Sequence, residues 1–245
     1  MFTLQNKTIL VTGASSGIGR ATAIMIASQG ANVILTGRNK DKLEEVSKIL
    51  NDDKHLALAL DLADEEAIQQ LSTAVGKIDG LVHCAGIIDY TLFKNLNREK
   101  YDQMFDINFY SGLQLTNLLL KNKNINKGAS LVYISSISSM FGVPATALYA
   151  ASKAALNAAI KVLATEVAPR KIRANTIMPG IVMTPMIDNA SGMIDSESFS
   201  NAEHAYPLGL GTPEDVACAC VFLLSAESRW ITGTSLLLDG GYSLI

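Results

Sequence analysis

A chain of 245 residues, 49% of them hydrophobic, is long enough to bury one sizeable core and suits a single α/β domain. The net charge of −3 and the scattered lysines and arginines exclude the basic footprint of a nucleic-acid-binding protein. The three cysteines lack CxxC spacing, which favours reduced thiols and no metal site. The apolar run 216–226 is too short to span a bilayer, and no leader-like segment begins the sequence. We therefore expect a soluble cytoplasmic protein without a membrane partner.

Short apolar runs rich in β-branched residues alternate with longer amphipathic segments along the whole chain. The runs predict strands at 7–13, 32–37, 55–60, 80–86, 130–136, 172–180 and 234–241. The segments between them predict helices at 17–29, 40–50, 64–75, 99–122, 149–168 and 213–226. Because the runs are mostly apolar throughout, without alternation, both faces of the sheet should be covered. The pattern predicts one α/β domain, 1–245, with a doubly wound seven-stranded parallel sheet and helices on both faces.

The first predicted strand ends in the glycine-rich turn TGASSGIG, residues 12–19. Parallel sheets of this type bind ligands at the carboxyl ends of their strands. Gly13, Gly17 and Gly19 leave room for a ligand beside the backbone, and the helix that follows offers free N–H groups to a pyrophosphate. The spacing is GxxxGxG, not GxGxxG, and a purely structural strand-to-helix turn is the alternative interpretation. We expect a dinucleotide site here.

The second predicted strand ends in TGRN, where a dinucleotide-binding protein distinguishes between cofactors. An acidic residue at this place would hold the ribose hydroxyls of NAD, but the sequence has Arg38, which is suited to a 2′-phosphate. This favours NADP, unless Arg38 is only a solvated surface residue. Asp61 and the triplet Cys84–Ala85–Gly86 end the next two predicted strands and should lie beside the adenine half of the same site.

Three residue types suited to proton transfer converge near the end of the fifth predicted strand. Ser136 ends that strand, and Tyr149 and Lys153 stand four apart in the helix that follows. Residues i and i+4 share one face of a helix, and an adjacent ammonium favours the phenolate, so Lys153 should lower the pKa of Tyr149. By itself, a YxxxK pair is an ordinary feature of helices. Its position at the carboxyl edge of the sheet favours a catalytic interpretation.

Together with Asn108, Pro179–Gly180 and the C-terminal LDGGY, these motifs resemble the classical group of short-chain dehydrogenases/reductases over essentially the whole chain. The resemblance implies a Rossmann fold that transfers hydride between NADP(H) and a carbonyl or a secondary alcohol. It implies that Tyr149 is the general acid/base and that Ser136 orients the carbonyl. Lys153 would lower the tyrosine pKa and hold the nicotinamide ribose, and Asn108 would anchor a water that relays protons to it. The cofactor residues that it implies are Gly13, Ser15, Ser16, Gly17, Ile18, Gly19, Arg38, Asp61, Leu62, Ala85, Gly86, Tyr149, Lys153, Pro179, Gly180, Ile181 and Thr184.

The sequence departs from the family pattern at Cys84, where an asparagine usually braces neighbouring strands near the cofactor. This puts the local rigidity in doubt, and we interpret Cys84 as a small buried residue, not a nucleophile. His83, beside it, is expected to be a satisfied core histidine. The segment of about 185–207 is rich in Ser, Met, Asn and Gly, which predicts a substrate lid.

Within the family, the length and the LDGGY ending are most similar to those of 3-oxoacyl-[acyl-carrier-protein] reductases. This resemblance implies an acyl-thioester substrate that acyl-carrier protein could carry. It also implies a homotetramer. A sugar or polyol dehydrogenase is the alternative within the family. A non-catalytic cofactor-sensing or scaffold subunit is the alternative of another class, and the presence of Ser136, Tyr149 and Lys153 argues against it.

Overall fold

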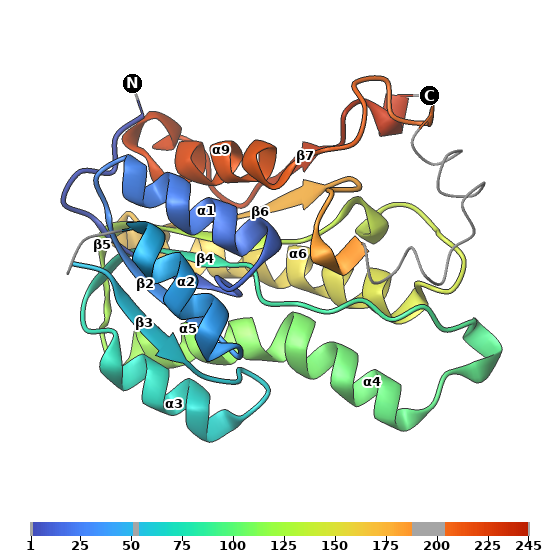
Figure 1. Ribbon diagram of the computed structural model, residues 1–245, viewed down its shortest axis with the longest axis horizontal. Coiled ribbons are helices and arrows are strands. Elements are labelled where there is room, and N and C mark those ends of the chain that lie inside the picture. The colour runs from blue at the N-terminus through green and yellow to red at the C-terminus, as the bar shows by residue number, and fades with distance from the viewer. Residues whose placement is uncertain (1, 51–53, 188–203, 245) are drawn as a thin grey trace.

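A computed structural model describes residues 2–50, 54–187 and 204–244 of the chain. It contains one sheet of seven parallel strands flanked by two layers of helices (Figure 1). The strands are β1 (Thr8–Thr12), β2 (Asn32–Gly37), β3 (Leu56–Ala59), β4 (Ile78–His83), β5 (Ile125–Ile134), β6 (Arg173–Pro179) and β7 (Ser235–Leu238). The helices are α1 (Gly17–Ser28), α2 (Lys40–Leu50), α3 (Glu65–Ala74), α4 (Arg98–Phe105), α5 (Ser111–Lys121), α6 (Ala147–Val167) and α9 (Pro213–Leu224).

The strand order is β3-β2-β1-β4-β5-β6-β7, so the direction of winding reverses between β1 and β4. At this switch point the loops after the two strands diverge to opposite faces of the sheet and leave a crevice at the carboxyl edge. The predicted doubly wound α/β fold is confirmed, and the crevice lies where the glycine-rich turn was expected to bind a dinucleotide.

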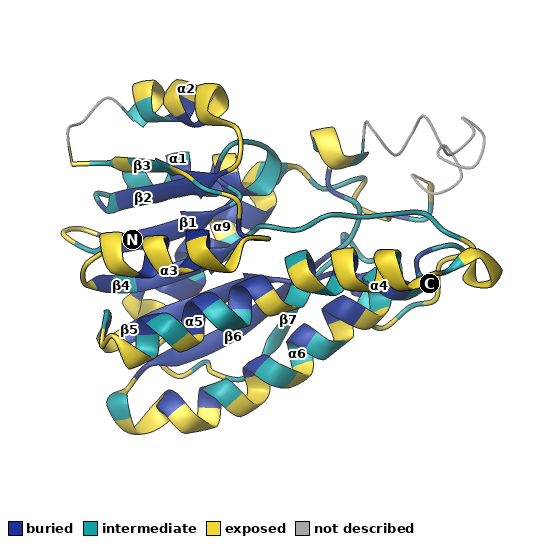
Figure 2. Ribbon diagram, turned by 90° about the horizontal axis from the view of Figure 1, so that it is seen from below, coloured by how far each residue is buried: buried dark blue, intermediate teal, exposed yellow. Residues whose placement is uncertain are grey.

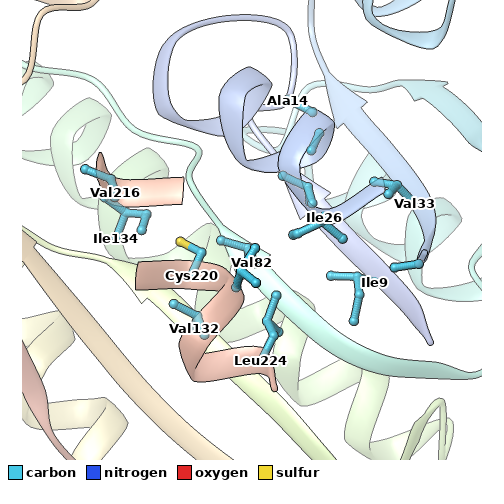
Figure 3. Packing of buried hydrophobic residues seen from close by; sticks show 14 of the residues in the cluster. Ile9, Ala14, Ile26, Val33, Val82, Val132, Ile134, Val216, Cys220 and Leu224 are labelled. Carbon is cyan, nitrogen blue, oxygen red and sulfur yellow. The ribbon is translucent and has the colours of Figure 1, made fainter. Parts of the chain in front are cut away.

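Burial explains why the strands are apolar on both faces. Ile9 and Val11 of β1 face a cluster that includes α1, α2 and α9, whereas Leu10 between them faces α3, α5 and α6. The central strands β1, β2, β4, β5 and β6 therefore appear mostly dark blue in Figure 2, whereas the edge strands β3 and β7 are more exposed. Figure 3 shows the first cluster, in which Cys220 and Leu224 of α9 pack toward the sheet. The two layers of helices hold the sheet in place, and the sheet in turn positions the crevice.

The structure differs from the predicted elements in two places that matter for the site. Strand β4 ends at His83, so Ala85 and Gly86 belong to the loop after it. The segment 99–122, predicted as one helix, is divided into α4 and α5 by a π-helical turn, Asp106–Tyr110. The sequence prediction ran through this turn because residues 106–110 contain no proline or glycine that would mark a break in the helix. π-Turns recur at functional sites, and Asn108 lies in this one.

Most of the predicted lid lies outside the described residues, which include 185–187 and 204–207 at its two ends. In the part of the chain that the structure describes, no helix is long and apolar enough to cross a membrane.

Candidate active site

The glycine-rich turn after β1 packs directly against the loop after β4. A Cβ atom on Gly13, whose φ is +65°, would come within 2.9 Å of the backbone nitrogen of Ala85, and Gly17 also has a positive φ, +51°. Gly13 therefore requires glycine for space and for conformation, and Gly17 requires it for conformation. Ser16 caps α1 in an extended conformation without a side-chain hydrogen bond to the helix. The N-terminus of α1 is thus directed at the crevice, as an anion site requires.

A groove of about 280 Å³ runs from this turn across the switch point. Its walls bring together predicted cofactor residues from the segments that follow five strands, β1, β2, β3, β4 and β6: Gly13, Ser15, Ser16, Gly17, Ile18, Gly19, Arg38, Asp61, Leu62, Ala85, Gly86 and Thr184. Cys84, expected beside the site together with Ala85 and Gly86, also lines the groove, and the sequence interpretation missed other lining residues, among them Asn39, Lys42, Ile87, Ile107 and Met186. The groove fits a dinucleotide by three features of its own: a glycine cradle, an open helix N-terminus and cationic side chains at one end.

The cationic end of the groove contains Arg38 and Lys42. Arg38 follows β2 and is exposed, and Lys42 lies in the first turn of α2, where Asn39 caps its backbone nitrogen at 3.0 Å. The N-terminus of α2 adds a partial positive charge at the same place. Lys42 was missed because residue type alone does not distinguish it from the other charged residues of α2. The signal would have been its place one turn beyond Arg38 at the edge that carries the ligand.

Three of the four predicted catalytic residues line a second, smaller pocket of about 100 Å³ that shares walls with the groove. Ser136, Tyr149 and Lys153 all contribute to it, together with Pro179 and Gly180 from the end of β6. Tyr149 is partly buried, whereas Ser136 and Lys153 are buried. The three side chains predicted to act together are thus brought together, where the groove meets the carboxyl ends of β5 and β6.

Tyr149 and Lys153 lie one turn apart on α6, with the lysine Nζ 5.7 Å from the centroid of the phenol ring. Lys153 Nζ donates a hydrogen bond of 2.9 Å to the backbone carbonyl of Ile134, the last residue of β5. Ser135 ties the same strand end to α6 by donating to the carbonyl of Lys153 at 3.2 Å. The helix and the strand end are therefore held together at the catalytic residues.

The pKa of Tyr149 does not follow the sequence prediction. Burial raises the pKa of Tyr149 to about 12, and the group that lowers it is the hydroxyl of Ser136, not Lys153. Burial also lowers the pKa of Lys153 to about 8. The physical reason is that both side chains lose hydration in the same pocket, which disfavours the charged forms of both. Lys153 is therefore close to its titration point near neutral pH, and Tyr149 is a protonated donor.

Ser136 caps a short 3₁₀ turn, Ile137–Ser139. Its hydroxyl accepts from the backbone nitrogen of Ser138 and donates to the hydroxyl of Ser138, both at 3.1 Å. Asn157 of α6 supports the turn from below, since it donates to Ser139 at 2.9 Å and Ser139 donates to the Ser136 carbonyl at 2.7 Å. A single hydroxyl proton serves Ser136, so a carbonyl oxygen in the pocket can take it only when the bond to Ser138 is released.

Asn108 joins the π-turn to the loop after β4. Its Oδ1 accepts from the backbone nitrogen of Ile87 at 2.7 Å, and its Nδ2 donates to the Ile87 carbonyl at 2.9 Å and to Ser152 at 3.2 Å. A Cβ on Gly86 would lie 3.2 Å from Asn108 Oδ1 and 3.4 Å from Lys153 Nζ. Gly86 therefore keeps space between the amide and the ammonium. The predicted water relay through this space stays a prediction.

The structure supplies a brace at the position where Cys84 replaces the family asparagine. The hydroxyl of Thr12 accepts from the backbone nitrogens of Cys84 and Ala85, each at 3.2 Å, and lies 2.9 Å from Nδ1 of His83. With both acceptor positions used, the hydroxyl donates to His83, which places the imidazole proton on Nε2. His83 is 1% exposed, and burial lowers its pKa to about 3. His83 thus helps to join β1 and β4 beside the groove, but the expectation of a satisfied core histidine is wrong, since its buried Nε2 has no hydrogen-bond partner among the described residues.

Two further observations concern alternative sites in the part of the chain that the structure describes. A hollow of about 480 Å³ between α3 and α5 is larger than the groove, but the residues that line it include none of Ser136, Tyr149 and Lys153, so volume alone does not identify the site. Among the described residues, no group of three His, Cys, Asp or Glu side chains could hold a metal ion.

The fold and the site define a class: an α/β protein with a dinucleotide groove that leads to a Ser-Tyr-Lys pocket. The family model described as enoyl-(acyl carrier protein) reductase matches residues 13–243. The chain is 36% identical over 246 residues to the 3-oxoacyl-[acyl-carrier-protein] reductase FabG of Rickettsia conorii, covering the whole of both chains. It is 32% identical to the NADP-dependent (R)-specific alcohol dehydrogenase of Lentilactobacillus kefiri, with 98% of each chain covered.

Among solved structures, a putative 2-deoxy-D-gluconate 3-dehydrogenase from Agrobacterium tumefaciens with bound NADP aligns with a TM-score of 0.89 and 30% identity, covering 100% of this chain and 99% of that one. The chain belongs to the short-chain dehydrogenase/reductase family of oxidoreductases. The family predicted from the sequence is confirmed.

Proposed function

We propose that this protein is an NADP(H)-dependent oxidoreductase that reduces a carbonyl group, and that its substrate is a 3-oxoacyl thioester of the kind carried by acyl-carrier protein. The observation that carries the proposal is the convergence of Ser136, Tyr149 and Lys153 on one pocket that opens into the dinucleotide groove. The names of the Rickettsia conorii and Lentilactobacillus kefiri relatives support the carbonyl chemistry and the cofactor, respectively.

The residues of the pocket divide the reduction between them. NADPH, when bound, supplies the hydride. Ser136 releases its bond to Ser138 and donates its hydroxyl to the substrate carbonyl, which orients the carbonyl and stabilises the developing oxyanion. Tyr149 is protonated at neutral pH because of its raised pKa, and it gives its proton to the same oxygen. Hydride on carbon and a proton on oxygen complete the alcohol.

Lys153 acts on Tyr149 and on the bound nucleotide. Its ammonium lies 5.7 Å from the centroid of the phenol ring, and it would hold the ribose next to the nicotinamide. With a pKa of about 8, Lys153 is mostly protonated at pH 7, and a small rise in pH makes it neutral. It can therefore return a proton toward Tyr149 between turnovers, and the space that Gly86 leaves between Asn108 and the ammonium is where a water would reprotonate the lysine.

The cationic end of the groove supports NADP over NAD. Arg38 offers the planar donor fork that suits a phosphate, and Lys42 and the N-terminus of α2 add positive charge at the same end. Asp61 Oδ1 accepts a hydrogen bond of 3.0 Å from the backbone nitrogen of Ala63, which caps the turn after β3. The carboxylate of Asp61 is thus hydrogen-bonded within the turn, and the side chains of Arg38 and Lys42 are available to a 2′-phosphate.

The walls of the catalytic pocket favour an acyl or simple ketone substrate over a polyol. Val182, Met186 and Ile187 form its outer wall, and these side chains offer apolar contact without donors or acceptors for hydroxyl groups. A sugar or polyol dehydrogenase is the second candidate, favoured by the aligned Agrobacterium tumefaciens structure. A non-catalytic role would leave the buried Lys153 without a purpose, because burying its charge costs stability.

The test is a substrate panel followed by NADPH oxidation at 340 nm. β-Ketoacyl thioesters on coenzyme A and on acyl-carrier protein, simple ketones and keto sugars are compared at equal concentration. The proposal expects the thioesters to have the highest kcat/KM. A preference for keto sugars would establish the second candidate, and no oxidation with any carbonyl would favour the non-catalytic alternative.

We propose in addition that the protein is cytoplasmic and forms a homotetramer. Support for assembly comes from apolar side chains exposed near the C-terminus: Trp230 at 90%, Leu237 of β7 at 38% and Leu244 at 84%. Strand β7 is also the edge of the sheet, where its outer backbone groups can pair or be covered.

A further inference from the structure

A buried tyrosine binds the backbone that follows β6. Tyr206 is 6% exposed, and its hydroxyl accepts a hydrogen bond of 3.0 Å from the backbone nitrogen of Ile181. Ile181 comes directly after Gly180, which lines the catalytic pocket with Tyr149. The tyrosine thus satisfies a backbone donor at the point where the sheet meets the site.

The ring of Tyr206 lies against Gly180 so closely that no side chain fits there. A Cβ on Gly180 would come within 2.7 Å of Cε1 of Tyr206 and within 3.2 Å of the Cα of Asp239. The same backbone is held from two more sides, because Gly180 donates to the carbonyl of Leu238 at 3.0 Å and Ile181 accepts from Gly211 at 3.0 Å. Removing the Tyr206 hydroxyl would release one of these restraints and keep the other two.

Two aromatic contacts fix the orientation of Tyr206. Its ring stacks on Tyr242 with centroids 4.9 Å apart and planes inclined by 28°. Tyr242 in turn meets the edge of Phe141 at 5.7 Å, and Phe141 follows the 3₁₀ turn that Ser136 caps. Such pairs prefer stacked or edge-on geometry, so the column holds its hydroxyl in place. Strand β7 pairs with β6, and the C-terminal segment that follows β7 is therefore linked to both walls of the pocket (Figure 1).

We infer that Tyr206 is a positioning residue that sets the Gly180–Ile181 backbone against the nicotinamide half of the cofactor. The inference rests on the proposed function, because it needs a dinucleotide in the groove. Pro179 and Gly180 face the pocket at the end remote from Arg38, so a shift of their backbone acts on the nicotinamide end and leaves the adenine end unchanged. The expected signature is therefore a loss of affinity confined to one half of the cofactor.

The experiment compares two ligands on the full-length protein by isothermal titration calorimetry. NADP⁺ fills both halves of the groove, whereas 2′,5′-ADP fills only the half beside Arg38. Tyr206→Phe keeps the ring and its stacking but leaves the Ile181 N–H without its acceptor. We expect the dissociation constant of NADP⁺ to rise about tenfold, the equivalent of one lost hydrogen bond, and that of 2′,5′-ADP to stay within about twofold.

Tyr133→Phe is the matched control. Its hydroxyl is also buried and hydrogen-bonded, at 2.6 Å to Thr116, but it lies in the core of the sheet. This variant should lower the melting temperature and leave both dissociation constants unchanged, so a general loss of stability is separated from positioning. Equal dissociation constants in wild type and Tyr206→Phe, or an equal rise for both ligands, would overturn the inference. Failure of the wild type to bind NADP⁺ would instead overturn the proposed function.

Discussion

Replacing His83 tests whether the brace beside the groove depends on a neutral imidazole. The folded-state pKa of His83 is lowered from its ordinary 6.5 to about 3, first by burial and then by the charge of Lys153. Below pH 6.5 the unfolded chain therefore binds a proton that the folded chain excludes. The stability contributed by neutral His83 is fully present above pH 6.5 and is lost as the pH falls from 6.5 toward 3.

The magnitude follows from the unfolded-state titration, because the folded state stays neutral at pH 5. Lowering the pH from 7 to 5 should cost the wild type about 2 kcal/mol through this one residue. His83→Gln keeps an acceptor for the hydroxyl of Thr12 and has no titrating group. The variant should therefore be less stable than the wild type at pH 7, and the difference should shrink by about 2 kcal/mol at pH 5.

Urea unfolding at pH 7, 6 and 5, at one ionic strength and one protein concentration, measures this difference. The same substitution at the exposed His204 controls for the chemical change itself. If the free energies of unfolding of wild type and His83→Gln run parallel from pH 7 to pH 5, then His83 titrates normally in the fold. The assigned proton on Nε2 and the brace through Thr12 would then be wrong.

Four further predictions concern catalysis, cofactor choice and assembly. Tyr149→Phe should lower turnover by about 10² to 10⁴ and leave the dissociation constant of NADPH nearly unchanged, and near-normal turnover would refute its role as proton donor. Arg38→Asp should reverse the preference for NADPH over NADH, which should be about ten- to a hundredfold in the wild type. Lys42→Ala should reduce this preference in the same assay. If neither variant changes the ratio of NADPH to NADH preference, both residues are solvated surface cations. The dissociation constant of NADPH, followed by its fluorescence, should rise above about pH 8 as Lys153 loses its charge, and Lys153→Met should show no such rise. Sedimentation at micromolar concentration should show a tetramer, and a monomer alone would contradict the proposed assembly.

The sequence by itself determined the class of fold, because that class depends on periodicity and punctuation. Apolar runs without alternation require a sheet covered on both faces, and the glycines of 12–19 mark the turn at its carboxyl edge. The same local rules placed Ser136 at a strand end and Tyr149 and Lys153 on one helix face. These are short-range properties, so neighbouring residues specify them without knowledge of the remainder of the chain.

Tertiary structure decided the features of the site that depend on contacts between segments far apart in the sequence. Lys42 joins Arg38 only because α2 begins at the edge that faces the groove, and Tyr206 reaches Ile181 across 25 residues of chain. The pKa of Tyr149 reversed the sequence prediction for the same reason. Spacing reveals that an ammonium is near, but only the packed pocket determines how much water both groups lose, and here desolvation outweighs the neighbouring charge.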